Sequence, residues 1–115
     1  MERLIFPYLT YTKPRRSLFP KKIRTGFIYT MNITEDRIKK MYSQHVGINE
    51  ELMRNIFGTS ESLFAFDTYQ FEDYSKVVCE RFDPEKKAKR RKEVFPKDCE
   101  SAFEMGIRFA QEGNC

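Results

Sequence analysis

Two short runs of apolar, strand-forming residues constrain the fold of this chain more than any other feature. The first is centred on residues 27–30 (FIYT) and the second on residues 63–66 (LFAF). Neither run alternates cleanly between apolar and polar residues, which is typical of strands that are buried on both faces of a parallel sheet. The sequence therefore predicts two parallel strands, at about 23–31 and 62–68.

Helical patterns occupy the region between these strands and the region after the second one. The clearest start signal is Asp83 followed by Pro84, an N-cap residue with proline at the first helical position. Thr34 is a further N-cap candidate, and Gly58 stands where a glycine commonly ends a helix. Helices are expected at about 35–42, 49–57, 84–94 and 97–111. A strand, a helical crossover and a second strand predict a right-handed βαβ unit, so the fold class is α/β.

The predicted sheet is too small to stand alone. Parallel sheets need helices on both faces and usually more than two strands. Residues 1–115 are therefore expected to form a single partial domain of the doubly wound type. Gly26, inside the first strand, predicts that a neighbouring element packs closely there. The last helix carries an apolar stripe that is expected to face the core: Cys99, Ala102, Phe103, Gly106 and Ala110, with Met105 and Ile107 at its edges.

The chain is basic, with 21 Lys and Arg against 17 Asp and Glu and a net charge of +4. Many of the basic residues fall in 13–24 and 86–92. On a helix, residues 86–92 span nearly two turns and point in most directions, so they are interpreted as a solvated face. An anionic cofactor or partner is the alternative. Nucleic acid is not expected, because no recognised nucleic-acid-binding motif accompanies the charge.

Several kinds of chemistry lack support in the sequence. His45 is the sole histidine and is interpreted as a loop residue, so nucleophilic catalysis with a histidine base has no candidate. Cys79, Cys99 and Cys115 are too widely spaced for a zinc or iron–sulfur motif, and their odd number favours a reducing, cytoplasmic setting. There is no apolar run of about 20 residues, so no membrane partner is expected.

The most informative candidate site is the carboxyl end of the first strand, at Tyr29, Thr30, Met31 and Asn32. Ligands of open parallel sheets bind outside the carboxyl ends of the strands. Backbone amides at that point can bind the edge of a planar heteroaromatic ring, with Thr30 and Asn32 adding polar groups and the other two residues adding packing. The alternative interpretation is an ordinary strand exit without a ligand.

Segments along essentially the whole chain resemble one family. They are residues 4–11 (LIFPYLTY), 19–32 (FPKKIRTGFIYTMN), 57–62 (FGTSES), 67–76 (DTYQFEDYSK) and 82–109. Together they resemble the carboxyl-terminal half of flavodoxin-like NAD(P)H-dependent FMN oxidoreductases, the set of FMN reductases and iron–sulfur flavoprotein-like proteins.

The resemblance implies a five-stranded parallel sheet with FMN at its carboxyl edge, and hydride transfer from NAD(P)H to FMN and on to an acceptor. Tyr29, Thr30, Met31 and Asn32 match a position that faces the flavin in this family. The family's loop for the FMN phosphate and its second flavin loop are not in this sequence. The chain is therefore expected to be a segment of such an oxidoreductase that alone binds FMN weakly or not at all. The alternative is a non-enzymatic module that packs through its open sheet edge against a partner, either a second copy or a complementary amino-terminal half.

Overall fold

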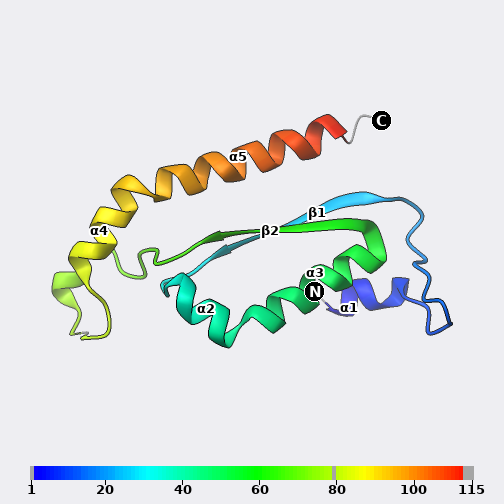
Figure 1. Ribbon diagram of the computed structural model, residues 1–115, viewed down its shortest axis with the longest axis horizontal. Helices are drawn as coiled ribbons and strands as arrows, with labels where there is room; N and C mark the ends of the chain where they lie inside the picture. The colour runs from blue at the N-terminus through cyan, green and yellow to red at the C-terminus, as the bar shows by residue number, and fades with distance from the viewer. Residues whose placement is uncertain (1, 79, 113–115) are drawn as a thin grey trace.

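The computed structural model describes residues 2–78 and 80–112 and has the α/β architecture expected from the sequence (Figure 1). In chain order, its elements are α1 (Glu2–Ile5), the 3₁₀ helix η1 (Phe6–Tyr8), β1 (Ile23–Thr30), α2 (Glu35–Met41), α3 (Ser43–Phe57), β2 (Gly58–Ala65), the 3₁₀ helix η2 (Tyr74–Lys76), α4 (Pro84–Glu93) and α5 (Phe95–Glu112). Within the described residues, the sheet consists of β1 and β2, which pair in parallel. Figure 1 shows α5 on one side of the strands and α2 and α3 on the other.

The two strands pair over their full length, from Ile23 opposite Gly58 to Thr30 opposite Ala65. The prediction for the first strand is confirmed, but the prediction of 62–68 for the second is shifted, because β2 begins at Gly58 and ends at Ala65. The first residues of β2 are polar, so the apolar run marked only its second half. Pairing with β1 extends it, and Thr25 Oγ1 also donates a hydrogen bond to the Thr59 carbonyl at 2.7 Å.

Burial along β1 alternates, so the prediction of a strand buried on both faces is wrong. Thr25, Phe27 and Tyr29 are half-buried, whereas Ile28 on the other face is 57% exposed. On the α5 side of the sheet, two side chains of α5 approach Gly26 closely. A Cβ atom there would lie 2.9 Å from Met105 Sδ and 3.1 Å from the Phe109 ring, which confirms the predicted close approach.

The crossover contains one helix as predicted and one that is longer than predicted. The helix expected at 35–42 is α2, but the helix expected at 49–57 begins at Ser43. His45 therefore lies in a helix and not in a loop. The early start carries no sequence signal, because α3 follows α2 after Tyr42 alone and no side chain caps it. Gly58, with φ of 114°, ends α3 as expected.

The last two helices are confirmed, but the face that α5 turns to the core is not the predicted stripe. Asp83 caps α4 by accepting hydrogen bonds from the Glu85 and Lys86 amides, each at 3.1 Å. In α5, Met105 is buried and Phe109 is half-buried, because Gly26 lets both approach the sheet. Phe103, at the middle of the predicted stripe, is 70% exposed, and Cys99 is exposed too. Cys79 and Cys115 lie outside the described residues.

The molecule is long and exposes much surface for its mass. Its radius of gyration is 18.0 Å and its extents are 54 × 30 × 21 Å, whereas a compact chain of this length has a radius of gyration of about 13 Å. The accessible surface is 9281 Å². A compact monomer of the same mass exposes about 6,600 Å². Roughly 2,700 Å² of surface is therefore exposed beyond what a compact monomer shows.

Candidate functional site

The segments that leave β1 and β2 are joined at the carboxyl edge of the sheet. The Met31 amide donates to the Ala65 carbonyl at 3.1 Å, and the Thr68 amide donates back to the Met31 carbonyl at 2.9 Å. The Asp67 amide also donates to the Ile33 carbonyl at 2.9 Å. Asp67 has φ of 51°, in the left-handed region that aspartate tolerates better than most residues. The two strand exits therefore form one hydrogen-bonded unit.

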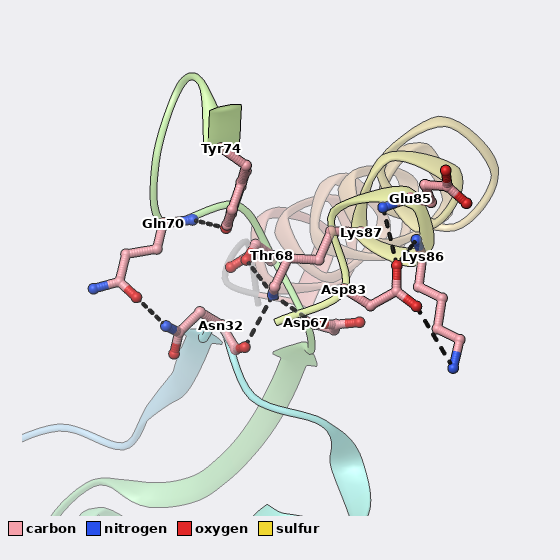
Figure 2. Close-up of polar contacts among 9 residues, drawn as sticks. All are labelled: Asn32, Asp67, Thr68, Gln70, Tyr74, Asp83, Glu85, Lys86 and Lys87. Carbon is pink, nitrogen blue, oxygen red and sulfur yellow. Dashed lines mark hydrogen bonds and ion pairs between the residues drawn. The ribbon is translucent and has the colours of Figure 1, made fainter. Parts of the chain in front are cut away.

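Lys87 of α4 inserts its ammonium group into this unit (Figure 2). Its Nζ donates to the Asn32 carbonyl at 3.0 Å, to the Thr68 carbonyl at 3.1 Å and to Asp67 Oδ1 at 2.5 Å. These bonds occupy all three donors of the ammonium group. Lys87 is 1% exposed, and its Nζ lies 4.9 Å from the centre of the Phe82 ring. We call Lys87, Asn32, Asp67 and Thr68 the Lys87 cluster.

The interpretation of residues 86–92 as a solvated face is therefore wrong at Lys87 and incomplete at its neighbours. Arg90 donates from both terminal nitrogens to Asp98 Oδ2 at 3.2 Å, and both side chains are largely buried. The Arg91 guanidinium lies 4.5 Å from the centre of the Tyr69 ring. Lys86, Lys89, Arg91 and Lys92 are exposed, as predicted. The difference arises because one side of α4 packs against the strand exits.

The four predicted site residues lie at the same sheet edge but not around one space. Tyr29 lies on the α3 face, where its Oη accepts a hydrogen bond from Asn49 Nδ2 at 3.3 Å and its ring stacks between Phe27 and Phe64. Thr30 borders a cavity on the other face. Met31 is half-buried, and Asn32 borders a second cavity. Thr30 and Asn32 thus each border a cavity, whereas Tyr29 packs within the sheet layer.

The two cavities lie on either side of Asp67, which lines both. The cavity beside Thr30 has a volume of about 300 Å³. It is lined by Thr30, Asp67, Thr68, Tyr69, Arg90, Arg91 and Phe95. The cavity beside Asn32 measures about 240 Å³, and its wall includes the cationic residues Arg37, Arg81, Lys86 and Lys87. The edge of the sheet therefore offers small, cation-lined spaces.

The loop after β2 is held by its own side chains. The Tyr74 ring meets the Tyr69 and Phe71 rings edge-on, with centroids 5.4 and 5.5 Å away. Tyr74 Oη accepts a hydrogen bond from the Gln70 amide at 3.0 Å, and Asn32 Nδ2 donates to Gln70 Oε1 (Figure 2). Asp73 Oδ1 accepts from the Ser75 hydroxyl and amide. These two bonds, the hydroxyl first, lower the pKa of the Asp73 carboxyl.

Sequence reasoning missed Lys87, Asp67, Tyr69 and Arg91 as site residues. Asp67 carried a usable signal. It comes directly after the apolar run at 63–66, and a polar residue that follows a buried parallel strand lies at the carboxyl edge of the sheet. Lys87 carried no local signal, because it sits in a run of basic residues and its partners lie far away in sequence.

Known proteins add no assignment: no family model, curated protein or solved structure matches the chain. In the part of the chain that the structure describes, no three His, Cys, Asp or Glu side chains come together as metal ligands. In that same part, no helix combines the length and the apolar character needed to cross a membrane.

Proposed function

We propose that this chain is the carboxyl-terminal part of a flavodoxin-like, NAD(P)H-dependent FMN oxidoreductase. The observation that carries the proposal is the carboxyl edge of the sheet. There, the backbone of residues 30–32 adjoins two small cavities, at the position where parallel sheets bind ligands. The order of segments that resembles the family supports the same assignment. Thr30 and Asn32 are the residues that would hold the edge of the flavin ring.

The proposal requires a domain larger than the described sheet, and the exposed surface agrees with this. Beside the roughly 2,700 Å² of extra surface, α5 carries the apolar residues Phe103 and Ile107, and both are exposed. In a doubly wound domain, a helix beside α5 would cover apolar side chains on its flank, and a strand beside β1 would pair with its free edge.

Bound FMN would supply the hydride chemistry of the complete protein, and the chain's own residues would position it. The Lys87 cluster fixes the segment after β1, because the Asn32 carbonyl is held by Lys87 Nζ. The side chain of Asn32 is held in turn by Gln70. Both groups of Asn32 are therefore already held by the chain's own side chains before any ligand binds.

Titration with FMN tests the proposal. Affinity for FMN in this fold leans on a phosphate-binding loop that the chain does not carry. We therefore expect weak binding, detected as slower hydrogen exchange at residues 29–32 in the presence of excess FMN. Riboflavin, which has the same ring without phosphate, should protect the same amides. A sub-micromolar dissociation constant for FMN would contradict the expectation that the chain holds only part of an FMN site. Protection confined to residues outside 29–32 would contradict the assignment of a flavin site there.

A second candidate function is a non-enzymatic module that packs against a partner chain. The observation that favours it is the extra surface together with β1, which pairs only with β2 among the described strands. Such an edge offers unpaired backbone groups to another strand. Analytical ultracentrifugation with hydrogen exchange would test it. A monomer whose free-edge amides in residues 25–30 are strongly protected would argue against the module.

A further inference from the structure

We propose that the cavity beside Thr30 is a binding site for an organic phosphate, with Arg91 as the residue that binds the anion. The cavity is formed by three segments distant in sequence: the end of β1, residues 67–69 after β2, and the junction of α4 and α5. This inference rests on the cavity and its charges and does not depend on flavin binding.

Three charged residues line the cavity, and two of them are in ion pairs. Asp67 is paired with Lys87, and Arg90 is paired with Asp98. Arg91 also lines the cavity, yet no carboxylate in the described residues forms an ion pair with it. Its positive charge is therefore the one on this wall that a ligand can neutralise.

The position of Arg91 is favourable for binding before a ligand arrives. Its guanidinium lies 4.5 Å from the centre of the Tyr69 ring, and this cation–π contact restricts the side chain while its N–H donors stay available. A planar guanidinium can donate two parallel hydrogen bonds to a phosphate. The hydroxyl-bearing residues Thr30 and Thr68 line the same cavity and offer further donors.

The remaining lining indicates what else the ligand carries. Tyr69 and Phe95 give the cavity an aromatic part, and a volume of about 300 Å³ exceeds the need of an inorganic phosphate. Small-molecule sites combine an apolar wall with a few convergent polar groups in this way. The ligand class that fits is a phosphate ester of a small ring compound, as in a nucleotide.

Equilibrium dialysis of the full chain against radiolabelled AMP tests this site, because it counts ligand per chain in whatever assembly the chain forms. We expect saturable binding of about one AMP per chain that inorganic phosphate displaces and added salt weakens. Arg91→Gln should weaken binding at least tenfold, on the order of one charge-assisted hydrogen bond. The affinity of Arg91→Lys for AMP should lie between that of the parent and that of Arg91→Gln. Lys92→Gln, an exposed change on the same helix, should bind like the parent.

The result that overturns the inference is AMP binding that Arg91→Gln leaves unchanged, or the absence of saturable binding. Binding that inorganic phosphate does not displace would mean recognition of the ring alone and would also overturn it. If circular dichroism shows that Arg91→Gln is unfolded, Arg91→Lys decides, and parent-like affinity then contradicts the bidentate role. Riboflavin carries no phosphate, so its effect on residues 29–32 tests the flavin proposal separately.

Discussion

The two ends of the sheet are held by opposite kinds of interaction. At the amino edge, Ile5 packs with Ile56 and Phe57 in a buried cluster, and four half-buried side chains surround it: Leu9, Phe19, Leu52 and Met53. At the carboxyl edge, the most buried side chain is that of Lys87, and its ammonium group makes three hydrogen bonds, one of them within an ion pair, and lies over the Phe82 ring.

The amino edge therefore contributes mainly to the stability of the fold, and the carboxyl edge mainly to the exact position of the backbone. Apolar packing is non-directional and grows with buried area, so the amino edge can hold the chain together with modest demands on atomic positions. The Lys87 cluster has directional bonds, and each carbonyl must lie near 3 Å from one nitrogen. The carboxyl edge, where a ligand is proposed to bind, is therefore the end whose backbone is positioned most strictly.

Replacing Lys87 should produce the largest loss of stability. In Lys87→Met, Asp67 loses its ion-pair partner and the Asn32 and Thr68 carbonyls lose their donor. We expect a decrease of about 3–5 kcal/mol in the free energy of unfolding. Urea denaturation followed by circular dichroism measures it.

Lys89→Met is the matched control for this change, because Lys89 is exposed on the same helix and its loss should cost within about 0.5 kcal/mol. A loss below about 1 kcal/mol for Lys87→Met would show that the cluster does not form in solution.

Ile56→Ala should weaken the opposite end by a somewhat smaller amount. Ile56 is 3% exposed, so truncation leaves a cavity, and a loss of about 2–4 kcal/mol is expected. Ile48→Ala in the same helix is the control, since Ile48 is exposed and should cost well under 1 kcal/mol. Hydrogen exchange would sharpen the comparison, because the hydrogen-bonded amides of Met31, Asp67 and Thr68 should keep their protection relative to those of Leu18 and Phe19. Equal loss at both ends would mean that the sheet unfolds as one unit.

Gly26→Ala tests the middle of the sheet. The added Cβ would lie 2.9 Å from Met105 Sδ and 3.1 Å from the Phe109 ring. The thioether can move but the ring is stiffer, so a loss of about 1–2 kcal/mol in the free energy of unfolding is expected. Gly47→Ala provides the contrast, because nothing lies within 4 Å of its Cβ position and the change should stabilise α3 by up to about 1 kcal/mol. If both variants were destabilised, the loss in Gly26→Ala could not be attributed to the close contact of its Cβ with Met105 and Phe109.

The smallest effect concerns Asp73 in the loop beside the carboxyl edge. Hydrogen bonds from Ser75 lower the pKa of the Asp73 carboxyl below its ordinary value of 3.8. The stabilising contribution is therefore present above the ordinary pKa and disappears as the pH falls through the lowered one. Nuclear magnetic resonance of the carboxyl carbon should give a pKa below 3.8 that rises in Ser75→Ala. An unchanged pKa in that variant would mean that the bond is absent.

Local signals were sufficient for much of the fold and for little of the site. Asp83 and Pro84 mark the start of α4 because capping acts within a few residues. The start of α3 at Ser43 was missed because that helix has no capping side chain. The position of Thr30 and Asn32 at the carboxyl edge could be predicted, because the end of a parallel strand is recognisable from its sequence. The burial of Lys87 was not, since it depends on carbonyls that only the folded chain brings to one point.

The stacked rings of Phe27, Tyr29, Phe64 and Phe66 give the strand register a spectroscopic signature. Successive centroids are 5.3–5.7 Å apart and neighbouring planes differ by 3–18°. Since side chains alternate between faces, a slip of β1 by one residue would carry Phe27 and Tyr29 to the α5 face and turn Thr30 away from its cavity. Ring-current shifts of the protons in this row, and the near-ultraviolet dichroism of Tyr29, therefore report whether Thr30 faces the cavity at the carboxyl edge.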